Sequence, residues 1–97
     1  MKDGNAMFIM PDFIHTPEEW IIWLLGSEFH ESASVDMLVQ RTRYRREDML
    51  SFIGVLERMK AIRVNRNAKD AMIIDSVALV PNGRTIYGDL ALRSGRT

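Results

Sequence analysis

The chain has 97 residues, 46 % of them hydrophobic, and its 13 basic residues balance its 13 acidic ones. A chain of this size can form one compact domain with a modest core, and domains this small are often only marginally stable alone. It contains no cysteine, which excludes disulfide bonds, thiolate metal sites and a cysteine nucleophile.

Two further classes are disfavoured by the sequence. No stretch approaches the roughly 18 consecutive apolar residues of a membrane-spanning helix, so we expect no membrane span. The N-terminus, which begins Met1-Lys2-Asp3-Gly4-Asn5, lacks the basic and apolar segments of a signal peptide. We therefore expect a cytoplasmic protein, which also agrees with the absence of cysteine.

Charge is distributed unevenly along the chain. Residues 1–40 contain one basic and seven acidic residues, a net charge of −6, whereas residues 41–97 contain twelve basic and six acidic residues, a net charge of +6. Such an asymmetry can mark a nucleic-acid-binding face on a protein that is neutral overall. A solvated surface with unevenly placed arginines explains it equally well.

The N-terminal part begins with an apolar stretch, Met7 to Ile14, which Pro11 interrupts. We expect residues 1–15 to form an extended arm over the protein's own core, or over a partner subunit as the less favoured alternative. Thr16-Pro17-Glu18-Glu19 then predicts a helix start with Pro17 in the first position and a capping box between Thr16 and Glu19. The apolar residues from Trp20 to Leu25 predict a buried helix that contacts its own core and a second chain.

Two further helices are predicted beyond a polar break at residues 31–34. The first runs from Val35 to about Arg41, with Ser34 as its cap and with Met37 and Leu38 facing inward. After a turn at residues 42–45 comes a helix without a good capping side chain, whose apolar residues recur at intervals of three and four. These residues are Met49, Phe52, Ile53, Leu56 and Met59. A basic turn leading into an amphipathic helix is typical of a helix-turn-helix.

The C-terminal part predicts a β-hairpin and a last helix. Strands are expected at residues 61–64 and 72–80, with a polar and basic turn between them. Residues 81–83, Pro-Asn-Gly, are expected to stop the second strand before a helix from Arg84 to about Arg93. That helix presents Ile86, Tyr87, Leu90 and Ala91 on one side, and residues 94–97 form a loose tail.

These motifs resemble the MarR-type winged-helix transcription regulators over about Asp36 to Leu90, in patterns that PadR-type winged helices share. Residues 56–62, L-E-R-M-K-A-I, occupy the place of the family's Leu-Glu-Arg-like stretch before a strand. Residues 79–84, L-V-P-N-G-R, match its Leu-Thr-x-x-Gly-Arg signature. Lys60 stands where the family commonly has glycine, and Val80 stands where it has a capping threonine. The resemblance implies an α+β winged helix-turn-helix, with about four helices and a two- or three-stranded antiparallel wing, in a single domain over residues 1–97.

The resemblance also implies a function and its residues. We expect a dimeric transcriptional regulator that binds double-stranded DNA, with the third helix in the major groove and the wing on the flanking backbone. The predicted DNA contacts are Arg41, Arg43, Arg45, Arg46, Ser51, Arg63, Arg66 and Lys69. The expected homodimer interface draws on Phe8, Ile9, Phe13, Trp20, Trp23, Ile86 and Leu90.

A second hypothesis is a winged helix used for protein–protein contact, for example an adaptor in plasmid or phage partition or assembly. Its motivation is the apolar surface expected at Leu50, Gly54 and Val55 on the third helix. Catalysis has little support, because the only histidines, His15 and His30, lack metal-ligand spacing and no phosphate-binding glycine loop is present. We therefore expect neither an enzyme nor a cofactor or metal site.

Overall fold

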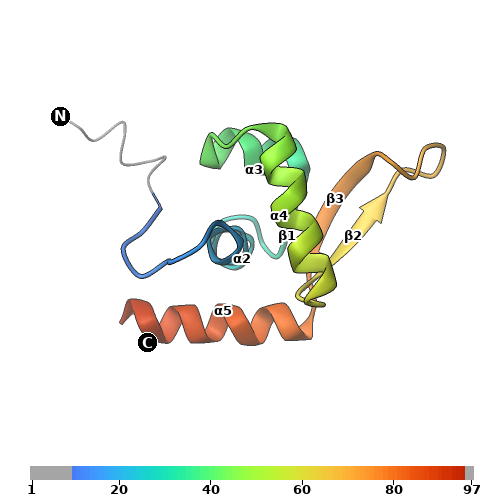
Figure 1. Ribbon diagram of the computed structural model, residues 1–97. Helices are drawn as coiled ribbons and strands as arrows, with labels where there is room; N and C mark the ends of the chain where they lie inside the picture. The colour runs from blue at the N-terminus through green and yellow to red at the C-terminus, as the bar shows by residue number, and fades with distance from the viewer. Residues whose placement is uncertain (1–9, 96–97) are drawn as a thin grey trace.

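The computed structural model describes residues 10–95, and Figure 1 shows how their helices and strands are arranged. In chain order the elements are α2 (Pro17–Ser27), β1 (Ser32–Ala33), α3 (Val35–Thr42), α4 (Arg46–Arg58), β2 (Ile62–Arg66), β3 (Ile74–Leu79) and α5 (Pro81–Ser94). Helix α2 lies at the centre, α5 passes along one side of it, and α3 and α4 lie on the other side (Figure 1). The hairpin of β2 and β3 projects away from the helices as a wing.

Helix α2 starts where the sequence predicts and is buried within this one chain. The Thr16 hydroxyl accepts a hydrogen bond from the Glu19 N–H at 3.2 Å, and Pro17 occupies the first turn. The predicted capping box is wrong in one detail, because the Glu19 carboxylate accepts from the His15 N–H at 2.8 Å rather than from Thr16. The six residues from Trp20 to Leu25 are all buried. Their burial needs no second chain.

Residues 10–14 cover the protein's own core, as the favoured alternative predicts. Ile14 is buried, and the Phe13 ring meets the Trp23 ring edge-on with centroids 4.8 Å apart. Trp23 also stacks on Tyr87 of α5, at 5.2 Å between centroids. Such aromatic pairs add to the stabilisation from burial alone. Phe8 and Ile9 lie outside the described residues.

Helices α3 and α4 form the predicted helix-turn-helix. The Ser34 hydroxyl caps α3 by accepting from the Met37 N–H at 3.1 Å. The expectation that Met37 faces inward is wrong, since 43 % of it is exposed. The buried positions of α3 are Val35, Leu38 and Thr42, spaced by three and four residues, so the residue next to Leu38 points away.

In α4 the predicted apolar side is buried at Met49, Ile53 and Leu56. Met59 was expected on that side but is 46 % exposed. It follows the last helical residue, so the helical spacing no longer fixes its direction. As predicted, no side chain caps the start of α4.

The three strands form an antiparallel sheet in the order β1-β3-β2. Ser32 pairs with Ala78, and Ile62 pairs with Leu79 at the base of the wing. Strand β3 begins at Ile74, two residues later than the sequence predicts, because residues 67–73 belong to the turn. This turn is held by the Asn67 side-chain oxygen, which accepts from the N–H groups of residues 69 and 70 at 2.9 and 3.2 Å.

The start of α5 differs from the prediction. Pro81 is the first helical residue, with Val80 as its N-cap, so the helix begins three residues before Arg84. No side chain caps this end, as expected with valine in place of threonine. The Asn82 amide nitrogen donates to the Met59 carbonyl at 3.0 Å and thereby ties α5 to the end of α4.

Candidate nucleic-acid interface

The turn between α3 and α4 brings two predicted DNA-binding arginines to the start of α4. Arg43 closes α3 in the left-handed conformation, with a φ of 66°, and its N–H donates to the Val39 carbonyl at 2.8 Å. Arg45 and Arg46 follow at the N-cap and the first helical position. The helix dipole makes this end of α4 attractive to anions, and the two guanidinium groups add to that field.

Both arginines pair with carboxylates of their own chain. The Arg45 Nη2 atom lies 2.6 Å from the Glu47 Oε2 atom, and Arg46 forms an ion pair with Asp36 in the first turn of α3. The arginine side chains remain 75 % and 54 % exposed. They are therefore accessible to a ligand, although their charges are offset by acids.

The start of α4 rests on aromatic side chains. The Tyr44 ring meets the Phe52 ring at 5.2 Å and the Trp20 ring at 5.7 Å between centroids, both edge-on. Tyr44 thus packs beneath the helix. Burial, assisted by the Glu18 carboxylate, raises the pKa of its hydroxyl.

Arg41 has a different position from the other predicted contacts. Its guanidinium makes a two-point contact with Glu28, with Nε–Oε1 and Nη2–Oε2 distances of 2.9 and 3.0 Å. It also lies 6.0 Å from the centre of the Trp20 ring. Arg41 therefore joins α3 to the end of α2.

Along α4, the predicted contact residue Ser51 is exposed. Leu50 is 39 % exposed, whereas Gly54 and Val55 are half-buried. The apolar surface suggested for protein contact is thus smaller than the sequence implied.

The wing carries the remaining predicted contacts, and their partners differ. Arg66 pairs with Glu57 of α4 at 2.9 Å. Arg63 on β2 and Lys69 at the tip are exposed and form no ion pair with any residue between 10 and 95. Beyond Lys69, Met72 is 89 % exposed and Ile73 is 49 % exposed. Sequence reasoning missed these exposed side chains, because it assigned both residues to a strand.

Several residues predicted for a dimer interface are instead core residues. Trp20, Trp23 and Leu90 are 2 %, 6 % and 1 % exposed in this chain. Phe13 and Ile86 are half-buried against the same core. Of these five residues, only Phe13 and Ile86 therefore offer surface to a partner.

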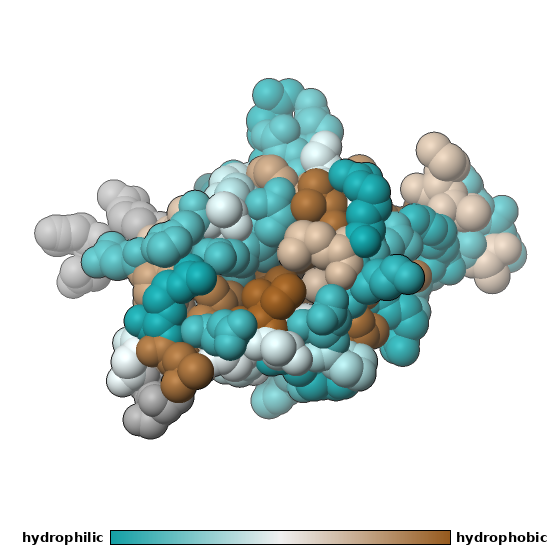
Figure 2. Space-filling view, turned by 60° about the horizontal axis from the view of Figure 1, so that its bottom comes forward, coloured by the Kyte–Doolittle hydropathy of each residue, from teal (hydrophilic) through white to brown (hydrophobic). Residues whose placement is uncertain are grey.

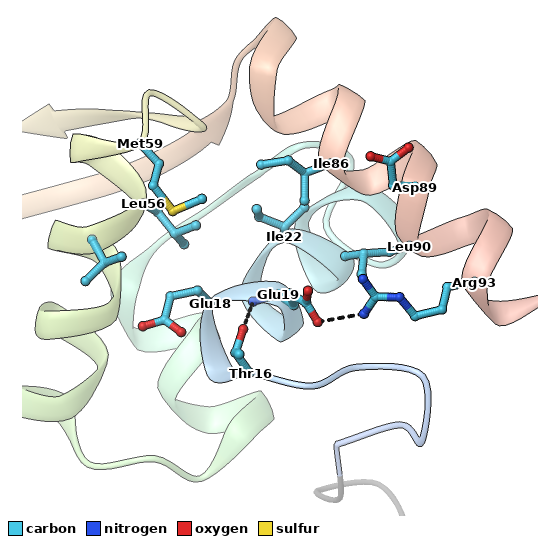
Figure 3. A pocket seen from close by; sticks show the side chains of 11 residues that line it. Thr16, Glu18, Glu19, Ile22, Leu56, Met59, Ile86, Asp89, Leu90 and Arg93 are labelled. Atoms are coloured by element: carbon cyan, nitrogen blue, oxygen red, sulfur yellow. Dashed lines mark hydrogen bonds and ion pairs between the residues drawn. The ribbon is translucent and has the colours of Figure 1, made fainter.

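A pocket of about 480 Å³ opens between α2, α4 and α5. Figure 3 shows its apolar walls, to which Ile22, Leu56, Met59 and Ile86 contribute. On the face formed by α5, hydrophobic residues gather in the centre and polar residues surround them (Figure 2). A pocket of this size falls within the range of small-molecule sites.

The polar rim of this pocket contains three acids and one base: Glu18, Glu19, Asp89 and Arg93. Arg93 Nη1 lies 2.9 Å from Glu19 Oε1 (Figure 3). Burial works to raise the pKa of Glu19, but the His15 N–H and the Arg93 guanidinium outweigh it and hold that pKa below its ordinary value.

The described residues contain neither a metal-binding cluster nor a membrane-spanning helix. Between residues 10 and 95, no group of three or more histidine, cysteine, aspartate or glutamate side chains is arranged to hold a metal ion. No helix in the same part of the chain combines the length and hydrophobicity needed to cross a membrane.

No protein-family model and no curated protein matches the sequence, but solved structures share the fold. BpsR of Bordetella bronchiseptica, whose DNA binding is regulated by 6-hydroxynicotinic acid, has a TM-score of 0.67 at 20 % identity, over 92 % of this chain and 65 % of its own. ZitR of Lactococcus lactis, a zinc-responsive MarR family member, has a TM-score of 0.66 at 13 % identity, over 87 % of this chain and 56 % of its own. The adhesin competence repressor AdcR of Streptococcus pyogenes has a TM-score of 0.67 at 13 % identity, over 84 % of this chain and 58 % of its own.

The chain spans 56 % to 65 % of the length of these three structures. At identities of 13 % to 20 %, this likeness shows the fold. This chain therefore has the winged-helix fold of the MarR-type regulators.

Proposed function

We propose that the protein binds double-stranded DNA and regulates transcription in the cytoplasm. The observation that carries this proposal is the exposed pair Arg45 and Arg46 at the start of α4, the helix that follows the turn of a helix-turn-helix. In proteins of this architecture, the second helix enters the major groove and its N-terminal residues contact base edges. Arginine suits both tasks there, because its planar fork matches phosphate oxygens and the guanine edge.

The remaining predicted contacts have supporting roles in this proposal. Ser51 would reach a base or a phosphate from the exposed side of α4, while Arg43 would contact the backbone beside the turn. Arg63 and Lys69 would place the wing on the flanking phosphates, because both are exposed and form no ion pair among the described residues. Phosphate contacts of this kind supply most of the affinity and make it dependent on salt.

The test is a binding titration of the purified protein against duplex DNA over a series of salt concentrations. For contacts to several phosphates, we expect log affinity to fall linearly with log salt, with a slope of about −0.9 per neutralised phosphate. A protein that fails to bind even at low salt would disprove the proposal. Measuring the mass in solution alongside tests the homodimer that we propose through Phe8, Ile9, Phe13 and Ile86.

A small-molecule site is the second candidate function, and the pocket between α2, α4 and α5 favours it. The rim has two more acids than bases, and the walls are apolar. We propose that the pocket binds a molecule with a positively charged group on an apolar body. It should not bind a carboxylate such as the 6-hydroxynicotinic acid that regulates DNA binding by BpsR. A primary amine on a hydrocarbon skeleton should raise the melting temperature of the protein, whereas a carboxylate on the same skeleton should not. Equal shifts from both compounds would remove the charge argument.

A protein partner is the alternative to DNA for the surface of α4. It draws on Leu50, the most exposed of the three apolar residues considered for such a contact. The salt series distinguishes the two, because a protein partner predicts no salt-dependent affinity for duplex DNA.

A further inference from the structure

Each arginine at the start of α4 is already bound by a carboxylate. Arg46 pairs with Asp36 across the α3–α4 turn, and Arg45 pairs with Glu47 at 2.6 Å. All four side chains have between 54 % and 75 % of their surface exposed. Ion pairs this exposed contribute little to folding. The stability of the fold therefore does not explain why both arginines have such partners.

These carboxylates compete with DNA phosphates. A phosphate and a carboxylate accept hydrogen bonds from the same guanidinium N–H groups. When Arg46 binds a phosphate, Asp36 loses its partner. The negative charge of Asp36 then lies close to the DNA, and the phosphates repel it. The same holds for Arg45 and Glu47. Arginines that must give up an ion pair therefore bind the DNA backbone more weakly than arginines without an acidic partner.

The repulsion is offset only where the duplex offers the carboxylate a hydrogen-bond donor. In the major groove these donors are the amino groups of cytosine and adenine, whose positions depend on sequence, whereas phosphates are the same everywhere. Glu47 belongs to the first turn of α4, and this part of the helix contacts base edges in a helix-turn-helix. A carboxylate there favours some sequences and disfavours the rest.

We infer that Asp36 and Glu47 are specificity-determining residues. By pairing with Arg46 and Arg45, the two acids weaken binding to phosphates alone. Glu47, in the first turn of α4, adds a contact with base edges that depends on their sequence. This inference rests on the proposed DNA-binding function.

The test compares the Asp36→Asn/Glu47→Gln variant with the unaltered protein on a random duplex. We expect binding roughly three- to tenfold tighter near 0.1 M salt, and a salt slope steeper by up to about 2, one unit for each released arginine. The matched control is Asp12→Asn/Asp89→Asn. It changes net charge equally, at two carboxylates that form no ion pair among residues 10–95. Circular dichroism should show the same helix content in all three proteins.

Selection from a random DNA library provides the second readout. The unaltered protein should enrich a defined sequence more strongly than the double variant. If the double variant binds random DNA no better than the charge-matched control and enriches the same sequence equally, the two acids do not determine specificity. If none of the three proteins binds DNA, the proposed function fails and the inference fails with it. The two failures are thus distinguishable.

Discussion

The first turn of α5 places Gly83 directly beneath the carbonyl group of Ala61. A β-carbon on Gly83 would overlap the Ala61 carbonyl oxygen and press on the Leu79 side chain. Ala61 precedes β2, and its carbonyl also accepts the Val80 N–H at 3.3 Å. The glycine of the Leu-x-x-x-Gly-Arg signature thus allows the last helix to approach the base of the wing.

Gly83→Ala should therefore destabilise the protein. Backbone atoms cannot move aside as a flexible side chain can, so we expect a loss of about 2 kcal/mol or more in the free energy of unfolding. Gly88→Ala is the control in the same helix, because a β-carbon there meets nothing within 4 Å. That control should be stabilised by up to about 1 kcal/mol. Urea denaturation of both variants measures the difference, and equal effects would contradict the close approach.

Lys60 ends α4 in the conformation that glycine adopts most readily. Its φ is 60°, its N–H donates to the Glu57 carbonyl at 3.0 Å, and the Ala61 N–H donates to the Leu56 carbonyl at 3.0 Å. This pair of bonds is a Schellman motif, which usually has glycine at this position. The glycine that MarR-type sequences commonly have here is therefore explained by backbone geometry.

Lys60→Gly should stabilise the protein by about 0.5 to 1 kcal/mol, because relief of the left-handed strain exceeds the entropy that glycine adds to the unfolded chain. Lys60→Ala is the control for the lost side chain and should change stability little. Thermal unfolding of the unaltered protein and of both variants measures these differences in stability. A glycine variant no more stable than the alanine variant would show that Lys60 carries no strain.

Local signals in the sequence predicted most element boundaries. The hydroxyl groups of Thr16 and Ser34 cap α2 and α3, and the buried residues Met49, Ile53 and Leu56 follow the predicted spacing. Caps and periodicity depend on residues within one or two turns of each other, so a sequence displays them directly.

Features that join distant parts of the chain were not predictable in this way. Glu31 and Arg84 form an ion pair at 3.0 Å although 53 residues separate them. The pairing of Arg46 with Asp36 likewise requires the α3–α4 turn to be in place. The sequence predicts that Pro81 stops a strand, whereas it begins α5. Proline is common at both places, and only Val80 separates β3 from α5. The sequence therefore predicted the DNA-binding arginines but not the acids that pair with them.

The Glu19 carboxylate should make stability depend on pH. Its pKa is lower in the folded chain than in the unfolded one. Its contribution is therefore present above the ordinary pKa of glutamate, about 4.3, and is lost as the pH falls through the folded value. Glu19→Gln should cost about 0.5 to 1 kcal/mol near pH 7 and progressively less below pH of about 4.3. Urea titrations at several pH values test this. A difference that stays constant with pH would contradict it, and Glu18→Gln controls for lost charge in the same turn.

On a duplex that carries the sequence selected by the unaltered protein, Arg45→Gln and Arg46→Gln should each weaken DNA binding. Losing one phosphate contact should reduce the salt slope by about 0.9 and the affinity by roughly five- to tenfold near 0.1 M salt. Glu18→Ala, at the start of α2, should leave both quantities unchanged. Equal effects from all three substitutions would show that the start of α4 is not the binding surface. Fluorescence anisotropy with a labelled duplex measures all of them.

Leu50 distinguishes DNA from a protein partner on the surface of α4. It is 39 % exposed and follows the buried Met49, so its replacement should leave the fold intact. If α4 binds DNA, Leu50→Asn should change the affinity less than about twofold, while Leu50→Asp should weaken it by adding a charge that phosphates repel. If α4 binds a protein, the two variants should lose binding alike, because both remove the apolar contact. Titrating both variants against duplex DNA therefore separates repulsion from lost burial, and equal loss of DNA binding would contradict our assignment of the α4 surface.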